Sequence, residues 1–202
     1  ACFHVPQNRE RLIFIGVRED LGLAPQHPKA QSNPITARSA WWGLPADRQI
    51  PEADHVWVDE LSRRTKWIDR AAALRPGERI VPDLPSPIRC WLDRPLPTIA
   101  KGANAGQPPY VRNSLIHPTQ PRTLSIREMA RAQSFPDAFR FVDALNNGMQ
   151  RIGNSVPPLL MHAVAQHIRT AVLDKVNTGA ADGEAVIDGL VNGGASMTEG
   201  AP

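Results

Sequence analysis

Hydrophobic positions mark a strand near the start of the chain and a helix after its middle. Residues 12–17, Leu-Ile-Phe-Ile-Gly-Val, form a continuous apolar run of mainly β-branched and aromatic side chains. Such a run predicts a buried strand inside an α/β sheet. Residues 125–134 predict a helix that ends at Phe135-Pro136. Its first residues, Ser125 and Glu128, have the spacing of a capping box, in which each side chain bonds a free backbone N–H of the other residue.

A second helix is predicted from about Ser155 to about Asp174. Asn154 and Ser155 are candidate caps, and Pro157-Pro158 fall in the first turn, where a missing N–H costs nothing. One face of this helix is apolar, through Leu160, Ala163, Val164, His167, Ile168 and Ala171. Residues 175–202 contain mostly small and polar residues, so we expect a disordered tail.

The middle of the chain predicts a loop-rich domain with short elements. Proline accounts for 20 of 202 residues, and residues 20–60 are rich in it and lack periodicity. Residues 58–74 are compatible with a helix, and residues 80–117 contain several short strand candidates. The five tryptophans are Trp41, Trp42, Trp57, Trp67 and Trp91. We interpret them as core residues rather than as a platform for stacking bases.

Composition and charge narrow the class of protein. The chain is 42% hydrophobic and 21% charged, it has no apolar run long enough to span a membrane, and its start lacks a signal-peptide pattern. We therefore expect a soluble, cytoplasmic protein. Residues 174–202 contain one base and five acids, which leaves 22 bases and 15 acids in residues 1–173. A basic body of this size permits a polyanionic partner without requiring one.

Cysteine usage favours neither a metal site nor a disulfide framework. Cys2 and Cys90 are isolated, and neither belongs to a CxxC pair. We predict that both are packing residues and that no metal is bound. The first residue is Ala1 and a predicted strand follows closely, so we expect the chain to begin inside a larger gene product.

Three motifs, in order, carry a family resemblance that covers roughly residues 3–172. Residues 5–16, Val-Pro-Gln-Asn-Arg-Glu-Arg-Leu-Ile-Phe-Ile-Gly, resemble a QxRxR motif followed by a strand. Residues 122–137, Arg-Thr-Leu-Ser-Ile-Arg-Glu-Met-Ala-Arg-Ala-Gln-Ser-Phe-Pro-Asp, resemble an RxL[ST]xRExARxQxFPD motif. Residues 150–158, Gln-Arg-Ile-Gly-Asn-Ser-Val-Pro-Pro, are similar to a QxIGN[SA]VP motif. Together they resemble the C-terminal portion of the DNA cytosine-5 methyltransferases.

The resemblance implies an α/β fold: the C-terminal part of a Rossmann-like, S-adenosylmethionine-dependent methyltransferase, plus a small irregular, mixed target-recognition domain. Residues 1–32 would end the catalytic domain and supply its pocket arginines and a sheet strand. Residues 33–118 would form the target-recognition domain, and residues 119–174 would return to the catalytic domain through a bracing helix and a final helix. Residues 175–202 would be the disordered tail.

The chemistry of cytosine methylation explains what the first motif would do. The base must leave the duplex, a thiolate adds at carbon 6, and negative charge develops on the ring. Arg9 and Arg11 alternate along an extended segment, so both project from the same side. In the family the arginine matching Arg11 contacts the oxygen at position 2 of the flipped base, and the one matching Arg9 helps to order the pocket. Gln7 belongs to the same target-cytosine pocket. Surface charges flanking a strand are the plainer interpretation of these arginines. His4 departs from the glycine usual in relatives, a local variation in this loop.

The last two motifs have different implied roles. Free N–H groups and the dipole at a helix N-terminus attract a carboxylate such as that of S-adenosylmethionine. The resemblance implies that Asn154, Ser155 and Val156 lie beside the methionine end of this cofactor, although ordinary helix capping would use the same residues. Residues 122–137 would brace the recognition domain, with Arg127 and Glu128 structural rather than catalytic. A DNA-binding helix-turn-helix is the competing interpretation, but we predict no second helix at suitable spacing.

Specificity is expected to come from the recognition domain. The stretch 97–104 resembles the Thr-plus-aliphatic pair of this family, and Thr98 is a candidate phosphate contact. Lys101, Asn104 and Arg112 are candidates for phosphates or base edges of double-stranded DNA. For each of these four residues a solvated loop side chain is an equally good interpretation.

The family's catalytic Pro-Cys loop, its Glu-Asn-Val segment and its glycine-rich cofactor strand do not occur in this sequence. We therefore expect the chain to be inactive alone and to need an N-terminal half, in the same polypeptide or as a separate subunit. Bacterial and phage-encoded enzymes both fit this expectation. The alternative is a non-catalytic DNA-binding remnant of a truncated methyltransferase. An isolated half would expose sheet edges and apolar helix faces, so we also expect weak stability or association.

Overall fold

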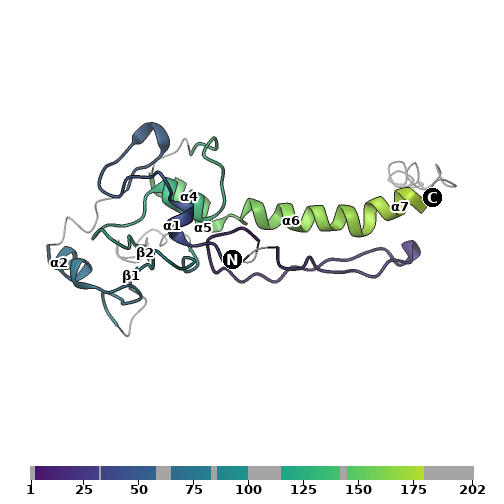
Figure 1. Cartoon of the computed structure of the whole chain (residues 1–202), viewed down its shortest axis with the longest axis horizontal. Coiled ribbons are helices and arrows are strands. Elements are labelled where there is room, and N and C mark those ends of the chain that lie inside the picture. The colour runs from purple at the N-terminus through teal and green to yellow at the C-terminus, as the bar shows by residue number, and fades with distance from the viewer. Residues whose placement is uncertain are drawn as a thin grey trace, which may run out of the picture. The chain divides into compact units, whose positions relative to one another are not determined.

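The computed structural model describes residues 3–31, 33–57, 65–82, 86–99, 115–141 and 145–179. Contacts divide the chain into two units. The first comprises Ala1–Leu12 and Lys29–His162, and the second comprises Ile13–Pro28 and Ala163–Pro202. Each unit is described by itself below, with the element labels of Figure 1.

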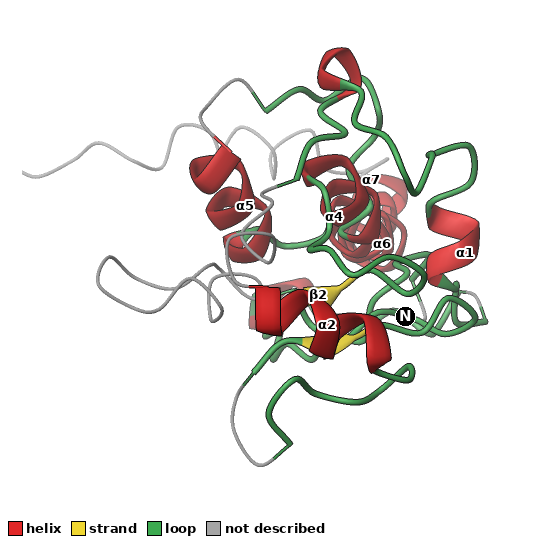
Figure 2. Ribbon diagram, turned by 90° about the vertical axis from the view of Figure 1, so that its left-hand side faces the viewer, coloured by secondary structure: helices red, strands yellow, loops and turns green. Residues whose placement is uncertain are grey.

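Short helices and one small sheet form the first unit. Its elements are α1 (Ala37–Ala40), the 3₁₀ turn η2 (Pro51–Ala53), α2 (Thr65–Ala73), β1 (Ile88–Arg89), β2 (Leu115–Ile116), α4 (Ile126–Ala132) and α5 (Leu145–Asn154). The two strands pair in parallel, with Ile88 opposite Leu115 and Arg89 opposite Ile116 (Figure 2). These short strands and long connections agree with the loop-rich middle section that the sequence predicts.

The main hydrophobic core gathers side chains from segments far apart in the sequence. Its members come from α1, β2, α4, α5 and the loops at 90–99: Ala37, Trp41, Cys90, Leu96, Ile99, Leu115, Leu124, Ile126, Met129, Ala130, Ala132, Met149 and Ile152. Cys90 is a free, buried thiol, as predicted, and burial raises its pKa above the ordinary range. Trp41 is also a core residue, whereas the prediction is wrong for Trp42, which is 83% exposed.

A smaller cluster joins α2 to the sheet. Ala71, Ile80 and Ile116 are its buried members, and Ile68, Leu74 and Val81 pack against them. Gly77 lies in the turn that leads into this region, at φ +92°, and its N–H donates to the Arg89 carbonyl over 2.8 Å. A Cβ atom at position 77 would stand 2.3 Å from Cζ2 of Trp91, so this turn requires glycine.

Gly77→Ala should therefore lower the free energy of unfolding by about 1–3 kcal/mol, because alanine is strained at this φ and would displace the Trp91 ring. Gly16→Ala is the matched control, since a Cβ at position 16 would meet no atom within 4 Å and the φ of Gly16 is not in the left-handed region. Urea unfolding of both variants measures the difference. Equal stability of the two would contradict the tight turn.

Helix α5 is an element that the sequence did not predict. Its Asn146-Asn147-Gly148 stretch resembles a turn, but Gly148 lies inside the helix. Glycine at this position allows α4 and α5 to approach closely, because a Cβ at position 148 would lie 2.9 Å from Cδ1 of Ile126. A second helix does follow residues 125–134, but not at the spacing of a helix-turn-helix, as predicted. The connection from α4 to α5 is much longer than the 3–4-residue turn typical of a helix-turn-helix.

The predicted strand at 12–17 is the clearest correction. These residues are extended, but they pair with no strand among the described residues. Leu12 is 82% exposed and Phe14 is 86% exposed, whereas Ile13, Ile15 and Val17 are half-buried. A strand needs backbone partners on a neighbouring strand. The sequence signalled β character correctly, but the described residues supply no such neighbour.

The second unit contains this extended segment, the 3₁₀ turn η1 (Glu19–Leu21) and helical residues 163–179. The final helix begins later than predicted, as α6 (Pro158–Ile168), and continues through a π-helical turn, η3 (Arg169–Leu173), into α7 (Asp174–Gly179). Its predicted apolar face is confirmed, because Ala163 and Val164 are buried and His167 bonds the Gln26 carbonyl over 3.1 Å. Residues 175–179 are helical rather than disordered, and residues 180–202 lie outside the described residues.

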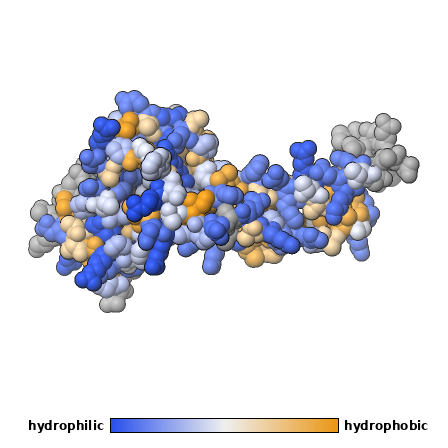
Figure 3. All heavy atoms as spheres, viewed as in Figure 1, coloured by the Kyte–Doolittle hydropathy of each residue, from blue (hydrophilic) through white to orange (hydrophobic). Residues whose placement is uncertain are grey.

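Hydrophobic and hydrophilic residues are interspersed on the face drawn in Figure 3. Among the described helices, none combines the length and the apolar character that crossing a bilayer requires.

Candidate functional site

The QxRxR segment is held in an extended conformation by its neighbour at Leu96. Asn8 N–H donates to the Leu96 carbonyl over 2.8 Å, and Leu96 N–H donates to the Pro6 carbonyl over 2.9 Å. These bonds make Gln7 and Leu96 an isolated parallel bridge pair. His4 precedes the segment at φ 57°, the left-handed region that glycine favours. The loop therefore keeps a glycine-like backbone despite the substitution.

Gln7 is buried and joins three parts of the first unit. Its Oε1 accepts a hydrogen bond from the Ile99 N–H over 3.0 Å, and its Nε2 donates to the Ala132 carbonyl over 3.4 Å. The amide thus ties the QxRxR segment to the stretch before residue 100 and to the end of α4. In this arrangement Gln7 positions other groups, and its side chain is already engaged on both sides.

Arg9 connects the same stretch to the end of α5. One terminal nitrogen donates to the Ile99 carbonyl and the other donates to the Gly153 carbonyl, each over 2.9 Å. Partial burial, and secondarily the positive charge of Arg11, lower its pKa. Its Nε atom is buried and has no hydrogen-bond partner within the described part of the chain. Arg9 uses both of its terminal nitrogens within the fold.

Arg9 and Arg11 line one polar hollow together with their neighbours in the chain. The hollow has a volume of about 540 Å³ and is lined by Asn8, Arg9, Glu10, Arg11 and Thr98. Arg11 is exposed, and its guanidinium donates to the Glu10 carbonyl over 2.6 Å. A guanidinium has five N–H donors, so this contact leaves others for a ligand.

Thr98 closes one side of the hollow. Its hydroxyl donates to the Asn8 carbonyl over 2.7 Å. While this bond is made, the hydroxyl proton is not available for a phosphate oxygen, which can only accept. The other candidate DNA contacts, Lys101, Asn104 and Arg112, lie outside the described residues.

Residues Gly153 and Asn154 end α5, and Ser155 and Val156 follow it, so Asn154 and Ser155 do not cap the start of a helix as predicted. Asn154 is the last residue of α5, and the Ser155 hydroxyl donates back to the Ile152 carbonyl over 2.7 Å. The next helix, α6, begins at Pro158, and its Leu159 N–H is satisfied by Ser134 Oγ at 3.1 Å. The helix-dipole argument for a carboxylate at Asn154 and Ser155 is therefore wrong, because the adjacent end of α5 presents carbonyls. Asn154 and Val156 are exposed.

The segment 122–137 builds a buried polar brace around α4. Ser125 and Glu128 form the predicted capping box: Ser125 Oγ accepts from the Glu128 N–H, and Glu128 Oε2 accepts from the Ser125 N–H. The Arg122 guanidinium donates two hydrogen bonds, of 2.9 and 2.7 Å, to the same carboxylate. The side chain of Glu128 is 1% exposed, and the Arg122 contacts help to hold its pKa below the ordinary value against the opposing effect of burial.

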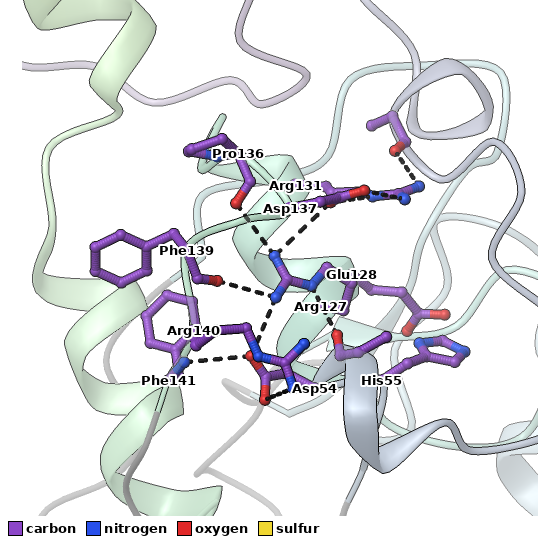
Figure 4. Close-up of polar contacts among 12 residues, drawn as sticks. Asp54, His55, Arg127, Glu128, Arg131, Pro136, Asp137, Phe139, Arg140 and Phe141 are labelled. Carbon is purple, nitrogen blue, oxygen red and sulfur yellow. Dashed lines mark hydrogen bonds and ion pairs between the residues drawn. The ribbon is translucent and has the colours of Figure 1, made fainter.

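Arg127 occupies the centre of a second cluster, drawn in Figure 4. Its buried guanidinium donates to the Ala53, Pro136 and Phe139 carbonyls and to Oδ2 of Asp54. Asp54 also forms an ion pair with Arg140 and accepts from the Phe141 N–H. Arg127 thus fixes the loop after η2 against residues 136–141. These contacts agree with the prediction that Arg127 and Glu128 are structural.

Sequence reasoning missed three polar residues of this region, of which two histidines are buried and one aspartate is half-buried. His55 bonds Ser125 Oγ at 2.8 Å and the Pro45 carbonyl at 2.7 Å. His117 stacks on Trp41, with 5.4 Å between ring centroids, and Asp54 adopts a left-handed φ of 54°. All three come from proline-rich segments without periodicity, so the pattern along the chain contained no signal for their contacts.

Comparisons with known proteins identify the family of this chain. The family model described as C-5 cytosine-specific DNA methylase matches residues 1–170. The type II methyltransferase M.XorII of Xanthomonas oryzae is 31% identical over 87% of this chain and 50% of its own length. M.AplI of Arthrospira platensis is 36% identical over 86% of the chain and 46% of its own length. The chain therefore spans about half the length of the curated relatives it matches.

A solved structure supports the fold. It is a prophage-encoded Escherichia coli protein described as a DNA modification methyltransferase, with a TM-score of 0.62, 24% identity, and coverage of 85% of this chain and 58% of that one. The likeness is consistent with part of an α/β methyltransferase fold. The extent of the family match decides the classification: this chain belongs to the C-5 cytosine-specific DNA methylase family.

Proposed function

We propose that the chain is the C-terminal part of a DNA cytosine-5 methyltransferase, which transfers a methyl group from S-adenosylmethionine to carbon 5 of a flipped cytosine in a specific DNA sequence. The observation that carries this proposal is the hollow shared by Arg9, Arg11 and Thr98. Its two guanidiniums are the groups suited to a base on which negative charge develops. The family membership gives this basic hollow its substrate class.

In this proposal Arg11 donates to the oxygen at position 2 of the target cytosine. Its exposure and its unused N–H donors support that role. Gln7 and Arg9 hold the hollow in shape through Ile99 and Gly153. The thiolate that adds to carbon 6 is supplied by residues outside this sequence, because neither Cys2 nor Cys90 follows a proline and Cys90 is buried with a raised pKa.

Residues 154–156 would hold the methionine end of S-adenosylmethionine, the cofactor that supplies the methyl group. Their donor set fits such a ligand. The exposed Asn154 amide can both donate to a carboxylate and accept from an ammonium, and the Ser155 oxygen can still accept. Val156, which is exposed, adds an apolar contact. This arrangement does not depend on a helix N-terminus.

DNA sequence would be read mainly by residues 33–118, between a catalytic segment at 1–32 and a return through 119–174. The excess of 22 bases over 15 acids in residues 1–173 supports a DNA partner. Lys101, Asn104 and Arg112 are proposed contacts to the duplex. Thr98 is a fourth, and its hydroxyl oxygen can accept from a base donor while its proton is bonded to the Asn8 carbonyl. The other proposed partner is the N-terminal half of the methyltransferase, which completes the enzyme.

The test is reconstitution with an N-terminal half that contains a Pro-Cys loop and a Glu-Asn-Val segment, followed by transfer of labelled methyl groups to duplex DNA. Methylation should require both halves, and Arg11→Ala should reduce it. Arg18→Ala is the control, because this arginine is exposed and paired with Asp20. DNA binding without transfer, whichever matched half is used, would replace the proposal with a non-catalytic DNA-binding role.

A further inference from the structure

We propose that Arg9 is a positioning residue that couples cofactor binding to DNA binding, an inference that rests on the proposed function. The two carbonyls that receive its guanidinium belong to the two sides of the site. Ile99 follows Thr98, which lines the hollow proposed for the target base, and Gly153 precedes the turn proposed for the cofactor. One rigid, planar group therefore spans both.

The hollow side of this link is fixed at several points. The Ile99 carbonyl accepts from Arg9, and the Ile99 N–H donates to Gln7 Oε1, so both backbone groups of Ile99 depend on the QxRxR segment. The Thr98 hydroxyl donates to the Asn8 carbonyl of the same segment. Ile99 is also a member of the main core. A shift of the QxRxR segment therefore moves the 98–99 stretch with it.

The cofactor side is fixed at the end of a helix. Gly153 lies in the last turn of α5, where carbonyls lack partners within the helix and a cation is favourable. Arg9 supplies both the hydrogen bond and the charge. Gln133 Nε2 donates to the neighbouring Ile152 carbonyl over 2.8 Å. The position of Asn154–Val156 relative to the hollow is therefore set in large part by Arg9.

This geometry has a thermodynamic consequence. A ligand that orders the 154–156 turn also orders Arg9, and with it the hollow, so that DNA binding is then less costly. Coupling between two binding sites is reciprocal, and it commonly amounts to roughly 5–150-fold in affinity. Lysine at position 9 would keep the positive charge but offer one nitrogen in place of the two that serve the two carbonyls, so it cannot reproduce the rigid, planar link of the guanidinium. Arg9→Lys therefore tests the link between the two carbonyls while the positive charge at position 9 is retained.

The experiment measures S-adenosylmethionine affinity of the reconstituted enzyme, with and without the duplex that it methylates. We expect the duplex to raise this affinity at least about fivefold in the wild type and less than about twofold in Arg9→Lys. The cofactor must change DNA affinity by the same factors. Arg18→Lys should keep the full wild-type coupling.

Full coupling in Arg9→Lys would overturn the inference, as would wild-type enzyme that binds both ligands without coupling. A reconstituted pair that binds neither ligand or transfers no methyl group would instead overturn the proposed function. Hydrogen exchange on unmodified enzyme covers the case in which Arg9→Lys fails to fold. Cofactor alone should increase protection of the amides of Leu96, Thr98 and Ile99 when no DNA is present, and unchanged exchange there would overturn the inference.

Discussion

Replacing Arg122 with methionine should lower the free energy of unfolding by about 3–5 kcal/mol, the usual cost of removing one partner from a buried ion pair. Two bonds of Arg122, 2.9 and 2.7 Å long, satisfy both oxygens of Glu128. Both side chains are buried, and the guanidinium also lies 3.9 Å from the centre of the Trp57 ring. Methionine fills similar space but leaves Glu128 charged, buried and unpaired by arginine.

Urea unfolding at neutral pH measures the effect. Arg18→Ala is the matched control, since its pair with Asp20 is exposed and such pairs contribute at most about 1 kcal/mol. The double variant Arg122→Met with Glu128→Leu should recover much of the loss, because it removes the buried charge as well as its partner. A loss in Arg122→Met no larger than that in Arg18→Ala would show that Glu128 does not depend on this arginine.

The brace also shows which parts of the fold are predictable from sequence. The capping box at Ser125 and Glu128 is a local device whose two partners are three residues apart, and it forms as predicted. The apolar face of α6 likewise follows from the helical period of the sequence, and its Ala163 and Val164 are buried as predicted. Interactions of this kind depend on short stretches of backbone, so the rest of the molecule changes them little.

Predictions failed where the outcome depends on distant segments. The run 12–17 has the composition of a strand, but a strand exists only beside another strand. Helix α5 contains Gly148, which local preference disfavours and beside which Ile126 of α4 packs closely. The cap of α6 comes from Ser134, 25 positions before Leu159, instead of from the adjacent Asn154 or Ser155. Each error concerns a contact that no short stretch of sequence contains.

The residues of the candidate site likewise divide into those that a local motif identifies and those whose roles depend on distant segments. The motif identifies Gln7 and Arg9, but their shared partner Ile99 became visible only in the folded chain. His117 is a stronger case, because a histidine in a proline-rich loop gives no sign of burial. Its ring stacks on Trp41, and its Nδ1 accepts from the Thr119 N–H over 3.2 Å. The proton of the neutral ring is therefore on Nε2, which lies 3.5 Å from Oε1 of Glu128.

Acid should destabilise the chain through this same histidine. Burial lowers the pKa of His117 from 6.5 to about 4; the nearby Glu128 opposes this shift, while Arg122, Arg89 and His55 add to it. In the unfolded chain His117 therefore binds a proton near pH 6.5, whereas in the folded chain it binds one only near pH 4. Stability is unaffected by this group above that window and falls as the pH decreases through it, by about 3 kcal/mol in total.

Urea unfolding of the wild type and of His117→Phe between about pH 7.5 and about pH 4 tests this expectation. Phenylalanine preserves the stacking surface against Trp41 but cannot bind a proton, so the decline over the window should be much smaller. His162→Gln, which alters an exposed side chain of α6, should retain the wild-type decline.

The pKa of Glu128 is itself lowered, with Arg122 among the causes, so the contribution of this carboxylate is lost at more acidic pH and does not mimic the effect of His117. An NMR titration in which the His117 ring of the folded chain takes up its proton near pH 6.5 would contradict the prediction, because the ring would then gain no stability from being neutral.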